Sequence, residues 1–553
     1  MLTKYQQPHT GGIIGAIWRW FDRSVLALGR EFRLSFMPPL MVYMAAGVAG
    51  ITSVVGAFYV KERLGLSAEF LAALGFWATL PWALKMPMGH MVDLMWRMKG
   101  IFVYIGAGMI ATSLLIMIGL LGYTDAMLAL APAEAWYVLA TLLAPVGYVV
   151  QDVVADAMTV EAVPRVDRDG KPYPAAQSKS MHTTMQLLGR VAIIGGLTLV
   201  GLVNVVLLQG VGELPDAQKA LAYLRIYELA LIIPLISVSG VLLASWLRHQ
   251  SIAQHVKQGR TRKQSVELID VHSESPPVNW WILGGGLAFV ALSIGVGLGE
   301  VAAAQEIVFA TSMAIVIFLI TQLTRELDSQ ARNLLVGTAI IIFAFRAVPT
   351  TGAGTSWWMM DDLGFDPQFF TVLSLIASGL TLFGIVIFRR FMAERSIAYI
   401  VGALTIAGAL LMLPDIGMYY GLHHWTAEVT NGVVDARFIA LIDTAIESPL
   451  GQIAMIPMLA WIANSAPPRL KATFFAVMAS FTNLALSASQ LGTKYLNQIF
   501  AVTREVRDPV SQEIVVPADY SELGMLLITA TLIALILPIL TIFLVRLSPL
   551  RNA

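Results

Sequence analysis

Residues 523–545 read LGMLLITATLIALILPILTIFLV, a run without a single charged side chain. An α-helix rises about 1.5 Å per residue, so a run of this length crosses the roughly 30 Å hydrocarbon core of a bilayer. Similar runs recur along the whole chain: 57% of its 553 residues are hydrophobic and 13% are charged, against about 25% charged in soluble domains. The sequence therefore predicts an all-α membrane protein with many spans.

The apolar runs predict about fourteen membrane helices. The first group lies at residues 40–60, 70–92, 101–121, 136–158, 181–208 and 221–247. The second group lies at residues 280–298, 304–323, 334–349, 369–388, 397–418, 438–462, 473–496 and 523–545. With the pair at 280–298 and 304–323 set aside, the rest divides into two halves of six helices, which is the major facilitator arrangement. We therefore predict a major facilitator fold with a two-helix insertion between its halves, and we interpret Gly284-Gly285-Gly286 within that insertion as a helix-packing surface.

This division gives five segments with different expected roles. Residues 1–36 hold five basic side chains and no short apolar core followed by a cleavage site, so we expect a cytoplasmic amphipathic segment and no removable signal peptide. The other segments are an N-terminal half at 37–247, a cytoplasmic linker at 248–278, the inserted helix pair at 279–330 and a C-terminal half at 331–553.

Lysine and arginine predict the orientation in the membrane. They occur in every second loop, for example at Arg97 and Lys99, whereas residues 122–135 and 299–303 hold none. Short cytoplasmic loops retain such residues and translocated loops lack them. The alternation predicts an even number of helices with both termini cytoplasmic, in a plasma membrane of the bacterial inner-membrane type.

Charged side chains inside predicted spans are the first candidates for function, because each costs roughly 2.5–3.5 kcal/mol to insert. Lys85 lies in the span that contains residues 81–93, PWALKMPMGHMVD. Pro81, Lys85 and Gly89 are spaced four apart and should share one helix face. Gly89 and Asp93, followed by Arg97, resemble the loop motif of major facilitators, in which the glycine allows close helix approach and the carboxylate locks the cytoplasmic gate.

Two carboxylates lie one turn apart in the fourth predicted span, at Asp152 and Asp156. In a low-dielectric cavity they raise each other's proton affinity, as a proton-coupled carrier requires. The structural alternative is that they pair with Lys85 or Arg190. The two interpretations are compatible, because breaking such pairs can couple binding to movement.

Further polar residues predict the remaining walls of a central site. In the fifth span His182, Gln186 and Arg190 follow at four-residue steps, and the planar Arg190 side chain can hold an anionic substrate group; we expect His182 to be structural. The opposite wall is expected from the C-terminal half, at Arg346, Asp443, Glu447, Ser480, Asn483, Ser487 and Gln490.

Taken together, these segments resemble the folate-biopterin transporter family of the major facilitator superfamily. The residues that carry the resemblance are Pro81-Trp82 with Lys85, Gly89 and Asp93, then Asp152-Val-Val-Ala-Asp156-Ala-Met-Thr-Val-Glu161, and in the second half Pro349, Leu363-Gly364-Phe365, Gln452-Ile-Ala-Met-Ile-Pro457, Ala472-Thr-Phe-Phe-Ala476, Ser480 and Asn483. The resemblance implies a carrier that takes up folates or pteridines with a proton gradient, and it implies that Lys85, Asp93, Asp152, Asp156 and Glu161 are family positions. Met86-Pro87-Met88, Arg346 and the inserted pair depart from the family pattern and leave the substrate open.

The sequence also leaves two other functions open. A related major facilitator can carry other anionic metabolites, such as muropeptide-like sugar-peptides, and a non-transporting sensor can use the inserted pair as a docking surface. The sequence has no HExxH motif or nucleophile elbow of an enzyme and no repeated pore loop of a channel. A net charge of +0 gives no indication of nucleic-acid binding. We expect no cofactor beyond an ion gradient, a small anionic substrate, a lipid surround and a monomer.

Overall fold

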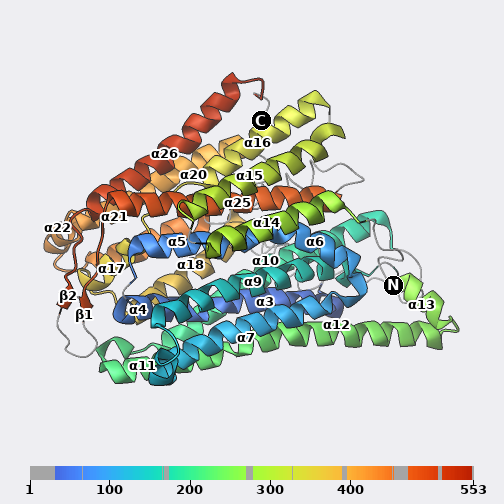
Figure 1. Cartoon of the computed structure of the whole chain (residues 1–553), viewed down its shortest axis with the longest axis horizontal. Helices are drawn as coiled ribbons and strands as arrows, with labels where there is room; N and C mark the ends of the chain where they lie inside the picture. The colour runs from blue at the N-terminus through green and yellow to red at the C-terminus, as the bar shows by residue number, and fades with distance from the viewer. Residues whose placement is uncertain are drawn as a thin grey trace, which may run out of the picture.

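The computed structural model describes residues 32–64, 66–164, 166, 173–269, 278–299, 301–326, 328–388, 391, 395–450, 453, 471–507 and 514–550. Its long helices lie side by side in a bundle (Figure 1). We call the end that carries the strands β1 (Val506–Arg507) and β2 (Ile514–Val516) the hairpin end. The end that carries helix α13 (Arg262–Ile269) is the linker end. The predicted amphipathic segment lies outside the described residues up to position 31.

We refer to helices α3 to α12 as the N-terminal half; 3-10 helices are written η. Its elements are η2 (Leu34–Phe36), α3 (Met37–Val48), η3 (Ala49–Thr52), α4 (Ser53–Arg63), α5 (Ala68–Thr79), η4 (Leu80–Leu84), α6 (Lys85–Leu94), η5 (Trp96–Met98), α7 (Gly100–Gly122), α8 (Thr124–Leu128), α9 (Ala133–Ala162), α10 (Ala175–Leu207), η6 (Val211–Glu213), α11 (Asp216–Ala230) and α12 (Ile232–Lys257).

The inserted pair and the C-terminal half follow α13. We keep the name inserted pair for α14 (Trp280–Leu298) and α15 (Ala304–Leu323), which are followed by η7 (Thr324–Glu326). The division into two halves and an insertion stays a prediction. The C-terminal half consists of α16 (Ser329–Arg346), α17 (Ala353–Asp361), α18 (Pro367–Ile387), α20 (Ile397–Leu411), α21 (Leu413–Tyr419), α22 (Leu422–Val429), α23 (Ala436–Glu447), η8 (Ser448–Leu450), α25 (Lys471–Ile499) and α26 (Leu523–Leu547), with β1 and β2 antiparallel between the last two helices.

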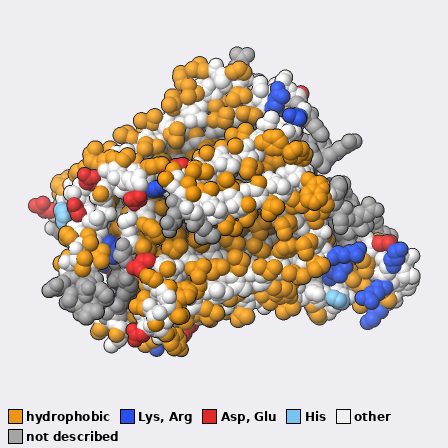
Figure 2. All heavy atoms as spheres, in the orientation of Figure 1, with side chains coloured by type: hydrophobic (Ala, Val, Ile, Leu, Met, Phe, Trp, Pro, Cys, Tyr) orange, Lys and Arg blue, Asp and Glu red, His pale blue; other side chains and the backbone are white. Residues whose placement is uncertain are grey.

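The surface of the bundle is that of a membrane protein. Figure 2 shows hydrophobic side chains along its length, and most of the charged side chains in view gather at its two ends. Within the described part of the chain, ten helical stretches are long and apolar enough to cross a membrane. The predicted all-α membrane fold is confirmed, while the count of about fourteen stays a prediction. The predicted spans outside those ten are 70–92, 334–349, 438–462 and 473–496.

Two local differences from the sequence expectations bear on the site. The span expected at 70–92 is not one continuous helix, because η4 at Leu80–Leu84 separates α5 from α6. Pro81 stands at the start of η4 and has no backbone N–H to donate to the preceding turn. The expectation that Pro81 shares one α-helical face with Lys85 and Gly89 is therefore wrong. In addition, α12 continues through the start of the predicted linker to Lys257.

Helices α3 and α10, which both carry site residues, approach each other at glycines. A Cβ atom on Gly196 would lie 2.9 Å from the backbone oxygen of Met44 and 3.0 Å from the Cα of Gly47. Backbones this close leave no room for a side chain, as at the small-residue interfaces of membrane helices. This contact fixes the distance between the two helices.

Replacing Gly196 by Ala is expected to destabilise the protein by about 1–3 kcal/mol, because the added methyl group must push α3 away from α10. The matched control is Gly195→Ala on the same helix, where an added Cβ meets nothing within 4 Å. Thermal unfolding of the two purified variants in detergent measures the difference. Equal midpoints for both variants would show that the α3–α10 contact is not tight.

Candidate functional site

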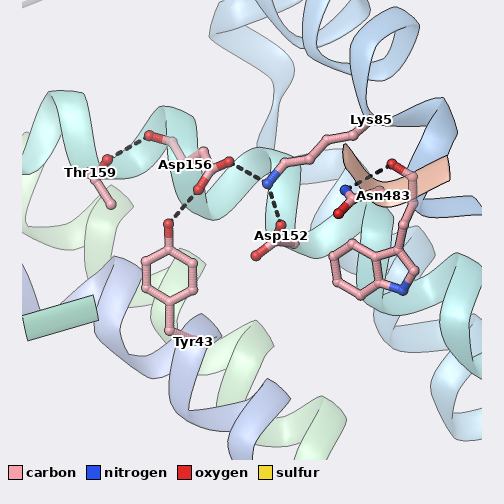
Figure 3. Close-up of polar contacts among 7 residues, drawn as sticks. Tyr43, Lys85, Asp152, Asp156, Thr159 and Asn483 are labelled. Carbon is pink, nitrogen blue, oxygen red and sulfur yellow. Dashed lines mark hydrogen bonds and ion pairs between the residues drawn. The ribbon is translucent and has the colours of Figure 1, made fainter. Parts of the chain in front are cut away.

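The candidate site forms around Lys85, the first residue of α6. The Lys85 Nζ lies 2.6 Å from Asp152 Oδ2 and 2.7 Å from Asp156 Oδ2. Both acids belong to α9, and their one-turn spacing presents both carboxylates to the same ammonium group (Figure 3). The predicted pairing of the two aspartates with Lys85 is thus present in the structure.

Tyr43 of α3 completes this cluster. Its hydroxyl donates a hydrogen bond of 2.5 Å to Asp156 Oδ1, the oxygen that faces away from Lys85 (Figure 3). The Tyr43 ring packs directly on α10, because a Cβ on Gly189 would lie 2.9 Å from Tyr43 Cε2. Asp156 therefore has a partner for each carboxylate oxygen, one charged and one neutral.

The two carboxylates differ in their access to the surroundings. The side chain of Asp156 is 43% exposed, against 17% for Asp152 and 18% for Lys85. Of the two acids, Asp156 is the one placed to exchange a proton with water. Asp152 is held deeper, beside Gln151, whose amide donates to the Val103 carbonyl at 3.1 Å and to Ser237 Oγ at 3.0 Å.

Arg190 of α10 adds a second cation to this region. It interacts electrostatically with Asp152 and with Tyr43. Among the described residues no hydrogen bond or ion pair of its guanidinium is found. The charges of Lys85, Arg190, Asp152 and Asp156 sum to zero when both acids are ionised. The side chains of His182 and Gln186, on the same helix, lie outside the described residues.

The polar residues of α25 face the second predicted span across the seam between the halves. Asn483 Nδ2 donates to the Trp82 carbonyl at 3.3 Å, one turn before Lys85 (Figure 3). Ser487 Oγ lies 3.1 Å from Thr79 Oγ1, and a Cβ on Gly75 would lie 2.6 Å from Gln490 Oε1. The structure brings Asn483, a predicted site residue of the C-terminal half, next to η4.

Arg346 ends α16, and its side chain is half-buried. The hydrogen bonds and ion pairs described for Lys85, Asp152 and Asp156 are made with other residues. The role of Arg346 as a substrate residue stays a prediction.

The predicted gate residues lie toward the linker end, where Glu161 forms an ion pair. Glu161 Oε1 accepts from Lys99 Nζ at 2.6 Å, and this ammonium also lies 4.3 Å from the centre of the Trp96 ring. Arg97 is exposed, and Asp93 is half-buried. Among the described residues a Cβ on Gly89 meets nothing within 4 Å, so the expectation that Gly89 allows a close helix approach is wrong.

Sequence reasoning missed several residues that the structure adds. Tyr43 is the one side chain of α3 with an oxygen or nitrogen atom, and no spacing rule connects it to an acid more than a hundred residues later. Gln151 was passed over although it directly precedes Asp152. Asp415 interacts electrostatically with Asp443 and Glu447, and this proximity follows only from the packing of α21 beside α23.

The chain resembles known proteins in sequence and in fold. The sequence profile of the BT1 family matches residues 46–552. The folate-biopterin transporter of Synechocystis sp. (strain ATCC 27184 / PCC 6803 / Kazusa) is 24% identical over 469 residues, which cover 84% of this chain and 75% of that protein.

Solved structures with the same fold are transporters as well. A POT family transporter in complex with 5-aminolevulinic acid superposes with a TM-score of 0.59 at 11% identity, covering 93% of this chain and 95% of that one. Another POT family transporter, in complex with a thioalcohol-conjugated peptide, gives a TM-score of 0.57 at 11% identity, covering 94% and 96%. These similarities confirm the predicted fold.

The BT1 family profile, the folate-biopterin transporter relative and the shared fold together define a multi-pass membrane transporter of the major facilitator fold. The chain belongs to the BT1 family, and the resemblance to folate-biopterin transporters stated from its motifs is confirmed.

Removal of Lys85 alone is expected to cost about 3–5 kcal/mol of stability, because Lys85→Met leaves two carboxylates inside the bundle without their cation. The double variant Lys85→Met with Asp152→Asn removes one of these charges and should recover part of the loss. Thermal unfolding in detergent measures both. If the double variant were less stable than Lys85→Met by the full cost of a separate Asp152→Asn substitution, the two groups would not be coupled.

Proposed function

We propose that the protein is a secondary active transporter that imports folate- or pteridine-like anionic heterocycles together with protons. The observation that carries the proposal is the single ammonium of Lys85 shared by two carboxylates within a transporter fold. Membership of the BT1 family and the similarity to a folate-biopterin transporter support the substrate class. The charged cluster supports the coupling to protons.

The charge balance of the cluster gives a physical route for this coupling. With both acids ionised, the cations Lys85 and Arg190 are neutralised by Asp152 and Asp156. A proton on Asp156 removes one negative charge and weakens its hold on Lys85 Nζ, 2.7 Å away. The cluster then carries a net positive charge that attracts an anionic substrate group, and Arg190 offers a planar donor pair for a carboxylate. Loading of the proton and loading of the anion thus favour each other.

The proposal also fixes a setting in the membrane. Both termini lie in the cytoplasm, the hairpin end faces outward, and the protein works as a monomer in a bacterial inner membrane. The basic residues at the linker end support this orientation, since short cytoplasmic loops retain lysine and arginine. Gln186 and Arg346 stay candidate substrate residues, and Asp93, Arg97 and Glu161 stay candidate gate residues.

Uptake into sealed vesicles tests the function directly. Purified protein is reconstituted in liposomes and offered labelled folate with and without an inward proton gradient, beside empty liposomes. We expect the gradient to drive accumulation above the equilibrium level. Unlabelled biopterin, pteroate and a sugar-peptide compete in parallel, and competition by the sugar-peptide alone would favour the alternative substrate class. Without gradient-stimulated uptake of any of these compounds, the proposal fails.

The variant Asp156→Asn separates proton coupling from substrate binding. We expect it to lose accumulation driven by the proton gradient at least about tenfold and to retain exchange of labelled for unlabelled substrate, because the neutral side chain mimics the protonated acid. Asp125→Asn is the control, since Asp125 is an exposed acid on α8. Unchanged gradient-driven accumulation in Asp156→Asn would assign the proton to another group.

A further inference from the structure

The inserted pair α14–α15 lies along the seam where the two halves meet. Helix α14 packs against α6 of the N-terminal half, and α15 packs against α25 of the C-terminal half (Figure 1). None of its residues belongs to the charged cluster around Lys85. The pair nevertheless contacts α6, which begins at Lys85, and α25, whose Asn483 contacts η4.

On the N-terminal side the pair is attached at both ends and in the middle. The backbone N–H of Asn279 donates to His90 Nε2 at 2.9 Å near the linker end. A Cβ on Gly286 would lie 2.4 Å from the Cβ of Pro87, so the backbone of α14 packs directly against the Pro87 ring of α6. The expected packing role of the Gly284-Gly285-Gly286 stretch is confirmed at this position.

At the hairpin end two adjacent residues of α15 reach opposite halves. Gln305 Nε2 donates to the Ala73 carbonyl of α5 at 3.1 Å. Glu306 Oε1 accepts from Lys494 Nζ of α25 at 3.2 Å and from the hydroxyl of Tyr495. The side chains of Lys494 and Glu306 are only 17% and 27% exposed, so water screens this ion pair little. One turn of helix thus ties α5 to α25.

The two halves also meet directly at this end. Gln498 Nε2 of α25 donates to Glu69 Oε1 of α5 at 2.6 Å. Ala68 of α5 is 2% exposed and packs in a cluster with Trp357 and Phe365 of the C-terminal half. A surface pocket of about 210 Å³ lies at this end, between Tyr223 and Phe365. The buried contacts of Ala68 and the Gln498–Glu69 hydrogen bond show that α5 and the C-terminal half are in contact at the hairpin end.

We propose that Gln305 and Glu306 form a clip that stabilises the conformation closed at the hairpin end. A transporter of this fold moves one half against the other, and opening at this end separates α5 from α25. Gln305 and Glu306 are adjacent, so they cannot keep their contacts with two helices that move apart. The separation must therefore break either the hydrogen bond to the Ala73 carbonyl or the ion pair with Lys494. Gln305 and Glu306 are positioning residues in this scheme, since they act on the site through α5 and α25. The inference rests on the transporter fold and not on the proposed substrate.

The absence of cysteine from the native sequence allows a direct test of opening. Ala68→Cys places one thiol between the halves at the hairpin end, where it is shielded while that end is closed. Its rate of reaction with a charged, water-soluble maleimide is measured on the full chain in nanodiscs, without substrate. Addition of Gly212→Leu calibrates the probe: a Cβ there lies 3.1 Å from the Cβ of Asp366 in the other half, so the larger side chain wedges the halves apart and must accelerate labelling.

Two variants remove the clip in this Ala68→Cys background. Lys494→Gln and Glu306→Gln are each expected to accelerate labelling about fivefold, which corresponds to a modest coupling between distant parts of a protein. The charge exchange Glu306→Lys with Lys494→Glu should restore the slow rate. The matched control is Arg395→Gln, which removes a cation 5.1 Å from the centre of the Tyr399 ring within the C-terminal half and should leave the rate unchanged. Arg395 follows the far end of α18, whereas Phe365, which packs in the cluster of Ala68, precedes α18.

The outcome is independent of the transported compound. Faster labelling in both clip variants, slow labelling in the charge exchange and no change in Arg395→Gln support the clip, even if folate is not carried. An unchanged rate in the clip variants, while Gly212→Leu raises it, overturns the proposal. Equal acceleration in Arg395→Gln overturns it as well, because the effect would then be general loosening. Elution of each variant as a single peak before reconstitution selects folded protein.

Discussion

The placement of one ammonium group between two carboxylates is the constraint on which the N-terminal half depends. A charge inside a bilayer is stable only with partners, and Lys85 has its partners on a different helix. The cluster therefore fixes how α6 lies against α9, and Tyr43 extends the same constraint to α3. The close approach of α3 and α10 at Gly47 and Gly196 then places Arg190 beside the cluster. The ion pairs of Lys85 and the close packing at the glycines therefore require the same arrangement of these helices.

The interruption of the second span extends this arrangement to the C-terminal half. Because Pro81 starts a 3-10 turn, backbone groups near it lack regular helical partners, and the Trp82 carbonyl accepts from Asn483 of α25. Polar contacts between α5 and α25 continue toward the hairpin end. The seam between the halves thus combines apolar packing, with Phe76, Leu80 and Leu484 in one buried cluster, and single directional hydrogen bonds that can be exchanged when the halves move. This suits a protein whose halves move against each other.

The sequence predicted the membrane helices and the paired acids because both signals are local. Apolar runs reveal spans, and the one-turn spacing of Asp152 and Asp156 places them on one face. Pairing with Lys85 or Arg190 was the structural alternative that the sequence left open, and the ion pairs with Lys85 are the ones found. The contact of Tyr43 was not predicted because it joins residues 113 apart in the chain. Nothing in the sequence of an apolar helix indicates that its hydroxyl group will contact a distant acid. Lys494 continues the three- and four-residue spacing of Asn483, Ser487 and Gln490 and so lies on the same face of α25. The prediction from this spacing ended at Gln490 and did not include Lys494.

The order of these residues along the chain also constrains synthesis. Lys85 precedes Asp152 by 67 residues, so the ribosome delivers the lysine to the membrane before its counter-charges exist. The helix that carries it is also not among the stretches apolar enough to enter lipid by composition alone. Until the fourth span is made, Lys85 has neither of the carboxylates that offset the roughly 2.5–3.5 kcal/mol cost of a lysine inside a membrane. The ion pair that organises the folded N-terminal half therefore becomes available only partway through the synthesis of that half.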